Sequence, residues 1–166
     1  MKIGIDIDGV VLDFERTMRF YAEYYDVLKK HNGKSKNEFS YLKNYDWSCD
    51  ERDEFIKEYL IKGTHECSLV PGSKCVIDLM HDLGCQIILI TARGSINKKT
   101  KIEVLNVLKK YNVYYDEIYF EVIDKVNVCK KIDIDLMIDD NPKICNELKN
   151  NMIKTIYLKD NDKKKR

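Results

Sequence analysis

Residues 1–15 read MKIGIDIDGVVLDFE, an apolar run that carries two aspartates, Asp6 and Asp8, with Gly9 directly after the second. Three structures compete for this pattern: a β-hairpin that turns at Asp8-Gly9, the start of a calcium-binding loop, and a pair of carboxylates at the end of a buried strand. The residues that follow adopt helical spacing instead of forming a second strand. The hairpin is therefore disfavoured.

The calcium loop fails on its spacing. Such a loop needs a glycine at its sixth position and a glutamate at its twelfth. Counted from Asp6, these positions hold Val11 and Thr17. The pattern therefore favours a strand over about residues 2–7 that ends in two carboxylates.

Downstream of residue 72 the chain alternates strands with helices. The apolar run CQIILIT is typical of a strand buried on both faces. We expect strands at 85–91, 117–122, 134–139 and 153–158, and helices at 73–83, 97–111, 124–132 and 142–149. Strands that alternate with helices indicate a parallel sheet covered on both sides. The predicted fold class is therefore α/β, with a five-stranded parallel sheet flanked by helices.

One segment, residues 12–71, interrupts this alternation and holds most of the aromatic residues. We expect a helix at 14–31, ended by Asn32-Gly33, and a second helix in the later part of 44–60. The segment is predicted to be a helical cap with its own small core. The expected organisation is a core domain from 1–11 and 72–160, a cap from 12–71, and a disordered basic tail from 161–166.

Composition excludes several classes of protein. Lysine and arginine number 29 against 28 acidic residues, a net charge of +1, which gives no reason to expect a nucleic-acid polymer or an acidic membrane as partner. No apolar stretch is long enough to span a membrane and no signal peptide precedes the first strand, so we expect a cytoplasmic protein, either a monomer or a homodimer. The six cysteines form no CxxC pair and are expected to be reduced structural thiols.

Polar residues follow two further predicted strands. Thr91 and Arg93 come after the strand at 85–91, and Asp139 and Asp140 end the strand at 134–139. Ligands of open α/β sheets bind beyond the carboxyl ends of the strands. A buried Asp139 would cost several kcal/mol without a partner, and a cation shared with the carboxylates of the first strand would remove that cost. Hard oxygen ligands suit Mg²⁺.

This constellation resembles the haloacid dehalogenase-like (HAD) phosphohydrolase superfamily. The resemblance rests on four motifs in order: DIDGV (6–10), ITAR (90–93), a lysine before the last active-site strand, and IDD (138–140). It implies a HAD-like Rossmannoid core with a small cap inserted after the first strand. It also implies a Mg²⁺-dependent phosphomonoester hydrolase that works through an aspartyl-phosphate.

The resemblance assigns roles to the carboxylates. Asp6 would be the nucleophile, and Asp8 the general acid and then the general base. Mg²⁺ would be held by Asp6, by the backbone carbonyl of Asp8 and by Asp139, while Asp140 would order metal-bound water.

The remaining motifs would hold the phosphate. Thr91 and the Ala92 N–H would bind phosphoryl oxygens, and Arg93 is assigned to the phosphate or the substrate, with a surface cation as its alternative. Lys125 is the preferred phosphate lysine because it starts the helix before IDLMIDD; Lys130 and Lys131 stay open as alternatives.

Within the superfamily, DIDGVVLDF, the helical cap and ITAR are closest to the 5′(3′)-deoxyribonucleotidases. That group hydrolyses nucleoside monophosphates and stacks the base on cap aromatics. Trp47 is a candidate for this platform, as are Phe14, Phe20, Tyr41 and Tyr45. Two alternatives stay open: a phosphatase for a sugar phosphate or other small phosphoester, and an inactive phosphate-binding or regulatory protein.

Overall fold

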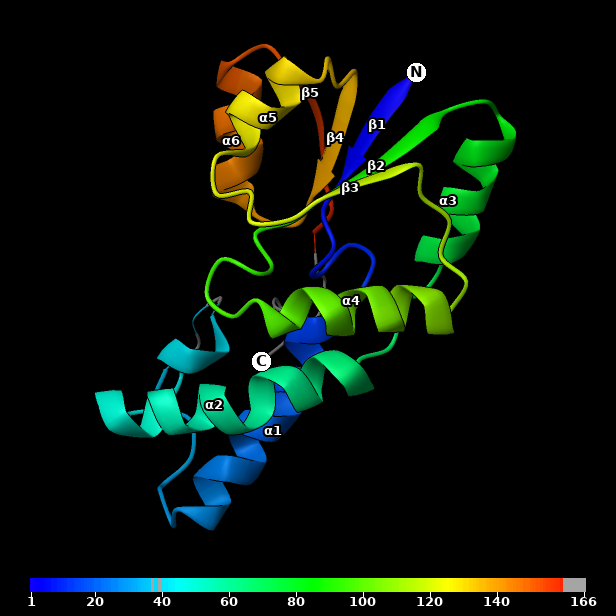
Figure 1. Cartoon of the computed structure of the whole chain (residues 1–166). Helices are drawn as coiled ribbons and strands as arrows, with labels where there is room; N and C mark the ends of the chain where they lie inside the picture. The colour runs from blue at the N-terminus through cyan, green and yellow to red at the C-terminus, as the bar shows by residue number, and fades with distance from the viewer. Residues whose placement is uncertain (37, 39, 160–166) are drawn as a thin grey trace.

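The computed structural model describes residues 1–36, 38 and 40–159, so the predicted basic tail at 161–166 lies outside the described residues. A five-stranded parallel sheet with the order β3-β2-β1-β4-β5 forms the centre of the described part (Figure 1). Its strands are β1 (Lys2–Ile5), β2 (Gln86–Ile90), β3 (Glu117–Tyr119), β4 (Leu136–Asp139) and β5 (Lys154–Tyr157). The predicted α/β class is thereby confirmed.

Six α-helices flank or extend this sheet in the described part of the chain. They are α1 (Phe14–Leu28), α2 (Cys49–Glu66), α3 (Ser73–Asp82), α4 (Lys99–Lys110), α5 (Lys125–Lys131) and α6 (Pro142–Asn150), with a 3-10 turn, η1, at Tyr41–Lys43. None of the described helices is long and apolar enough to cross a membrane. The six cysteines form no disulfide.

Strand β2 shows why the sheet has helices on both faces. Successive side chains of a strand point to opposite sides. Ile87 and Leu89 pack with residues of α3 and α4, whereas Ile88 and Ile90 pack with residues of α5 and α6. All four side chains are buried, so a continuous apolar run is what a strand in this position requires.

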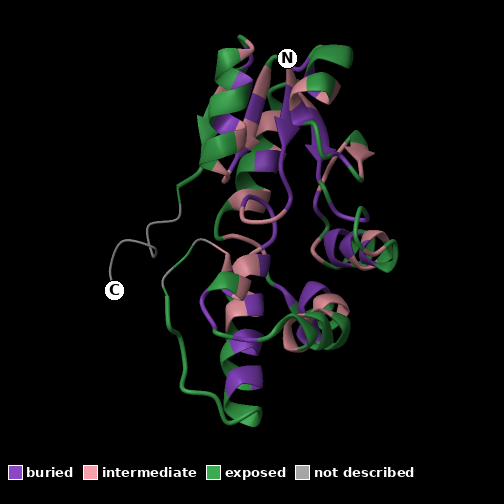
Figure 2. Cartoon of the chain, turned by 90° about the vertical axis from the view of Figure 1, so that its left-hand side faces the viewer, coloured by how far each residue is buried: buried purple, intermediate pink, exposed green. Residues whose placement is uncertain are grey.

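The cap is built from α1, η1 and α2, which lie beyond the carboxyl end of β1 (Figures 1 and 2). Its buried side chains form an aromatic-rich cluster separate from the two clusters on the sheet. Helix α2 packs against both α1 and α4, and this contact joins the cap to the core.

Helix α1 ends earlier than its sequence suggests. It stops at Leu28 instead of at Asn32-Gly33, because Lys30 takes a positive φ of 58° and the His31 N–H bonds back to the carbonyl of Asp26. The expected stop signal has another use, since the Gly33 N–H donates to Oδ2 of Asp26 at 2.9 Å.

Helix α2 starts earlier than expected, whereas α3 starts where the sequence predicts. Helix α2 begins at Cys49, because Ser48 and Glu51 form a reciprocal capping box. For α3 the capping residue is Gly72, and the hydroxyl of Ser73 donates to the carbonyl of Val11 instead of capping the helix. This bond ties the return of the chain from the cap to the end of the first strand region.

Candidate active site

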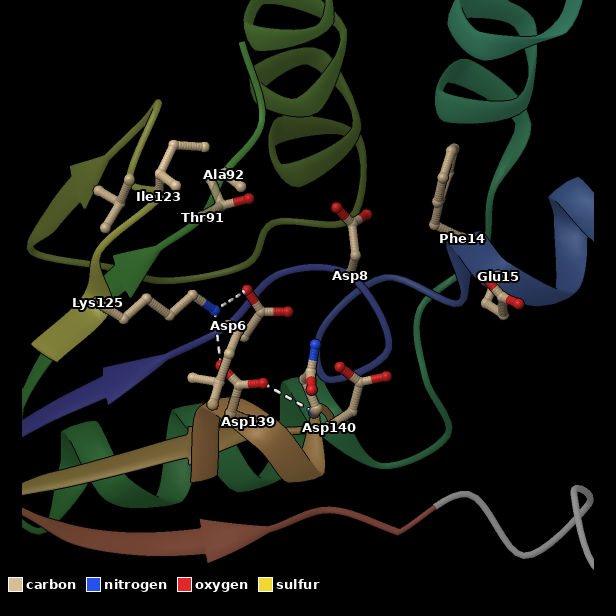
Figure 3. A pocket seen from close by; sticks show the side chains of 13 residues that line it. Asp6, Asp8, Phe14, Glu15, Thr91, Ala92, Ile123, Lys125, Asp139 and Asp140 are labelled. Carbon is tan, nitrogen blue, oxygen red and sulfur yellow. Dashed lines mark hydrogen bonds and ion pairs between the residues drawn. The ribbon is translucent and has the colours of Figure 1, made fainter. Parts of the chain in front are cut away.

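The carboxyl ends of β1, β2 and β4 open into one pocket of about 350 Å³ (Figure 3). Because β1 lies between β2 and β4, the residues that follow these strands meet at the same edge of the sheet. The residues that line the pocket are Asp6, Asp8, Phe14, Glu15, Thr91, Ala92, Val122, Ile123, Lys125, Asp139, Asp140, Asn141 and Ile144. The structure thus brings together most of the candidate residues from four distant segments.

Lys125 joins the two central carboxylates. It is the first residue of α5, and its buried Nζ lies 2.6 Å from Oδ1 of Asp6 and 2.6 Å from Oδ2 of Asp139. Lys130 instead donates to Asn151, and Lys131 is exposed. Of the three lysines considered from the sequence, the structure therefore places only Lys125 in the pocket.

The burial of these groups shifts their protonation. Desolvation, together with the neighbouring charges of Asp139 and Asp8, raises the pKa of Asp6 to about 7, against the opposing effect of Lys125. Burial acts to lower the pKa of Lys125, but the attraction of Asp6 and Asp139 outweighs it and the pKa is raised. The lysine is therefore a fixed positive charge, whereas Asp6 titrates near neutrality.

Asp139 has partners of its own. It is almost fully buried, with one carboxylate oxygen bound by Lys125 and the other accepting the N–H of Asn141 at 2.8 Å. Lys125 and the backbone N–H of Asn141 are therefore partners that already compensate the burial of this carboxylate, and a shared cation would add to them.

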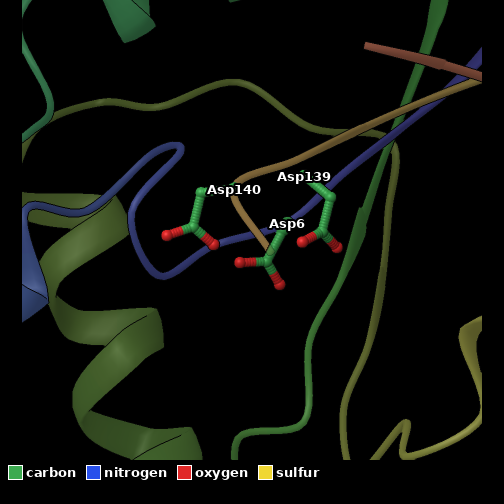
Figure 4. A group of neighbouring side chains, drawn as sticks. All are labelled: Asp6, Asp139 and Asp140. Carbon is green, nitrogen blue, oxygen red and sulfur yellow. The ribbon is translucent and has the colours of Figure 1, made fainter. Parts of the chain in front are cut away.

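Three carboxylates remain close enough for a cation. Oxygen atoms of Asp6, Asp139 and Asp140 all lie within 4.8 Å of one another (Figure 4). Gly9 allows this approach: its φ is +84°, and a Cβ there would lie 2.3 Å from Oδ2 of Asp140. Three negative charges against the single charge of Lys125, all on hard oxygen donors, fit a divalent cation such as Mg²⁺.

Thr91 and Ala92 lie beside this cluster, as expected for phosphate ligands. Oγ1 of Thr91 is buried and accepts the N–H of Arg93 at 3.1 Å, which leaves the hydroxyl proton as a donor. Ala92 is exposed to the pocket, where its backbone N–H is a second candidate donor.

Arg93 differs from both expectations, because it neither lines the pocket nor lies on the surface. The side chain is only 8% exposed, and its Nε and NH2 groups donate to the two carboxylate oxygens of Asp8 at 2.6 and 2.8 Å. The third nitrogen, NH1, donates to Oγ1 of Thr64 at 2.8 Å. Arg93 therefore contacts the proposed acid/base residue instead of the substrate.

Trp47 is likewise placed away from the pocket. It is 3% exposed within the cap core, its ring stacks on Tyr45, and its indole N–H donates to Oδ1 of Asp26 at 2.8 Å. A buried indole with its polar group satisfied has no free face for a base, so the platform assignment is not supported here. Among the aromatic candidates, Phe14 is the one that lines the pocket.

Sequence reasoning missed part of the lining. Val122 and Ile123 follow β3, and Ile144 lies in the first turn of α6. The rule that ligands bind beyond strand ends could have identified Val122 and Ile123, because β3 ends at the same edge of the sheet. Their apolar side chains carry no chemical motif and were overlooked for that reason.

No family model matches the chain, and no curated protein matches it significantly. Solved structures do. A hydrolase from Streptococcus pneumoniae TIGR4 has a TM-score of 0.70 at 16% identity, covering 97% of this chain and 94% of that one. A haloacid dehalogenase-like family hydrolase from Streptococcus pneumoniae has a TM-score of 0.67 at 15% identity, with 98% and 88% covered.

A third similar structure, described as a predicted phosphatase from Clostridium acetobutylicum, has a TM-score of 0.65 at 16% identity, covering 94% of this chain and 83% of that one. At these identities the likeness establishes the fold. The chain therefore has the fold of the HAD-superfamily hydrolases over nearly its whole length.

Proposed function

We propose that this chain is a Mg²⁺-dependent phosphomonoester hydrolase that works through an aspartyl-phosphate on Asp6. The observation that carries the proposal is the buried Asp6 carboxylate, which faces the pocket within a cluster of Asp139, Asp140 and Lys125. The fold shared with HAD-superfamily hydrolases and a predicted phosphatase supports the same class of reaction.

In the first step, a carboxylate oxygen of Asp6 attacks phosphorus while the ester oxygen leaves. The P–O bond to the leaving group breaks as the bond to Asp6 forms, and Asp8 supplies the proton that makes the leaving group an alcohol. Covalent catalysis of this kind divides one slow hydrolysis into two easier steps.

In the second step, water attacks the phosphorus of the aspartyl-phosphate. Asp8 takes a proton from this water, the bond between phosphorus and Asp6 breaks, and inorganic phosphate leaves with Asp6 restored. Lys125 and the Thr91 hydroxyl provide fixed donors for the charge on the phosphoryl oxygens.

Mg²⁺, held by Asp6 and Asp139 with Asp140 beside them, would keep Asp6 ionised and offset its repulsion of the phosphate. The protonation of Asp6 supports this requirement. Burial raises the pKa of Asp6 to about 7, and a protonated carboxyl is a poor nucleophile.

A (deoxy)nucleoside monophosphate is the substrate we favour. Apolar side chains of Phe14, Val122, Ile123 and Ile144 line the same pocket as the carboxylates. They offer an apolar surface for a flat base outside the phosphate site. The polar Glu15 and Asn141 in the same lining suit the hydroxyls of a ribose, and for that reason a small sugar phosphate is the second candidate.

The test is phosphate release from a panel of nucleoside 5′- and 3′-monophosphates and sugar phosphates, with Mg²⁺ or with EDTA. We expect turnover that requires Mg²⁺, is lost in Asp6→Asn, and is fastest on a nucleotide. Fastest turnover on a sugar phosphate would keep the chemistry and change the substrate. Absence of turnover on every compound would refute the hydrolase and leave a phosphate-binding protein.

A further inference from the structure

The guanidinium of Arg93 links the core to the cap. On the core side it holds both carboxylate oxygens of Asp8 in a bidentate pair, at 2.6 and 2.8 Å. On the cap side its NH1 group donates to Thr64 in α2, and its Cζ atom lies 3.7 Å from the ring centroid of Phe14 in α1. Every donor nitrogen of this buried side chain is used, so its position depends on both cap helices.

Thr64 is itself held firmly. It is fully buried, and its hydroxyl donates to the carbonyl of Leu60 one turn earlier in α2 while its oxygen accepts from Arg93. The two bonds fix the hydroxyl. The position of α2 therefore determines where the guanidinium lies, and the guanidinium in turn orients Asp8. A bidentate guanidinium pair fixes the orientation of a carboxylate more strictly than a single hydrogen bond does.

The orientation that results suits proton transfer on the side of phosphorus opposite Asp6, where the ester oxygen leaves in the first step and water enters in the second. In Figure 3 the carboxylate of Asp8 lies on the cap side of the pocket, apart from the group formed by Asp6, Lys125 and Asp139. An in-line displacement at phosphorus places the entering water opposite the bond that breaks, which is the bond to Asp6. A base for this water therefore belongs across the pocket from Asp6.

We infer that Arg93, anchored by Thr64 of the cap, is a positioning residue that orients Asp8 as the base for water attack on the aspartyl-phosphate. The inference rests on the proposed function. In the step concerned, a bond forms between the water oxygen and phosphorus, the bond from phosphorus to Asp6 breaks, and Asp8 accepts one water proton. Both Asp8 oxygens accept hydrogen bonds from Arg93, so the guanidinium sets the direction in which the carboxylate faces the pocket.

The experiment separates the two steps with p-nitrophenyl phosphate, whose leaving group needs no proton. For this substrate kcat/KM reports attack by Asp6, whereas kcat is limited by water attack once the phosphoenzyme accumulates. In Arg93→Met we expect kcat to fall about 100-fold with kcat/KM within about threefold of wild type, since loss of a positioned base costs about 10²–10⁴-fold. Arg93→Lys should recover only part of the loss, because lysine restores the positive charge but cannot form the bidentate pair with Asp8.

A direct readout accompanies the kinetics. Acid quenching during turnover of p-nitrophenyl phosphate measures the fraction of protein that carries phosphate, and phosphate release from a deoxynucleoside monophosphate is followed in parallel. We expect this fraction to rise from minor in wild type to dominant in Arg93→Met. A purely structural role for the arginine would lower the activity without accumulating phosphoenzyme.

Thr64→Val provides a second variant in case Arg93→Met does not fold, since it keeps the arginine and removes only the anchoring oxygen. We expect the same signature with a smaller fall in kcat, about tenfold. The matched control is Thr155→Val, where the hydroxyl bonds only a nearby carbonyl of the β5 segment, and it should behave as wild type.

The outcomes distinguish this inference from the function on which it rests. The inference alone would be overturned if turnover is lost in Asp6→Asn while Arg93→Met and Thr64→Val accumulate no phosphoenzyme. In that case kcat and kcat/KM of the last two variants would fall equally. Unchanged kinetics in both variants would do the same. Absence of wild-type turnover on both substrates would overturn the proposed function and the inference with it.

Discussion

Replacing Lys125 with methionine tests the electrostatic centre of the site. The substitution keeps an unbranched side chain one atom shorter and removes the charge that lies 2.6 Å from both Asp6 and Asp139. Two buried carboxylates would then face each other without a counter-charge. We therefore expect Lys125→Met to lose both stability and activity.

The magnitude follows from the burial of the groups. The side chains of Lys125, Asp6 and Asp139 are 5%, 10% and 1% exposed, so solvent screens the pair only weakly. Breaking a buried pair by removing one partner costs about 3–5 kcal/mol. The loss should be greater at about pH 8.5 than at about pH 6, because protonation of Asp6 relieves the repulsion.

The assay is urea unfolding of wild type and variant in EDTA. With slopes of about 1–3 kcal/mol per molar urea, the expected loss moves the midpoint down by about 2 M. Lys130→Met is the matched control, because Lys130 is exposed and makes one hydrogen bond, to Asn151 at 2.7 Å. The free energy of unfolding of this control should change by less than about 0.5 kcal/mol. Equal midpoints for the two variants would refute the buried triad.

Four further changes probe the site and the cap. Because the pKa of Asp6 is raised to about 7, its contribution to stability is present below about pH 4 and is lost as the pH rises through about 7. Mg²⁺ should therefore raise the melting temperature more at about pH 8 than at about pH 5. Trp47→Phe should lower the unfolding free energy by about 1–3 kcal/mol, measured in urea, because it leaves the buried carboxylate oxygen of Asp26 without its donor. The KM of this variant for nucleotides should stay unchanged, whereas Phe14→Leu should raise the KM. Gly9→Ala should weaken Mg²⁺ binding in calorimetry by about 10–100-fold, because the new Cβ displaces the Asp140 carboxylate.

The sequence was sufficient for the sheet and for the residues at its carboxyl edge. Short apolar runs and the regular alternation of strands with helices are local signals, and they located β1, β2 and β4 to within two residues at each end. Strand ends in a parallel sheet meet by topology, so Asp6 and Asp139 could be brought together without knowing any side-chain contact.

Contacts between distant segments could not be predicted in this way. Arg93 and Asp8 are 85 residues apart, and no periodicity indicates that the arginine turns away from the pocket to bind a carboxylate. The position of Trp47 depends on a hydrogen bond to Asp26 across the cap, which is a tertiary contact as well. The early end of α1 at Leu28 has a local origin, because Lys30 already takes the left-handed conformation three residues before Gly33.

The most direct test of the central claim is mass spectrometry of the protein after acid quenching during Mg²⁺-dependent turnover. The account predicts one added phosphoryl group on the peptide that contains Asp6, absent from Asp6→Asn and from samples with EDTA. Turnover without this label, or a label on another residue, would contradict the assignment of Asp6 as the nucleophile.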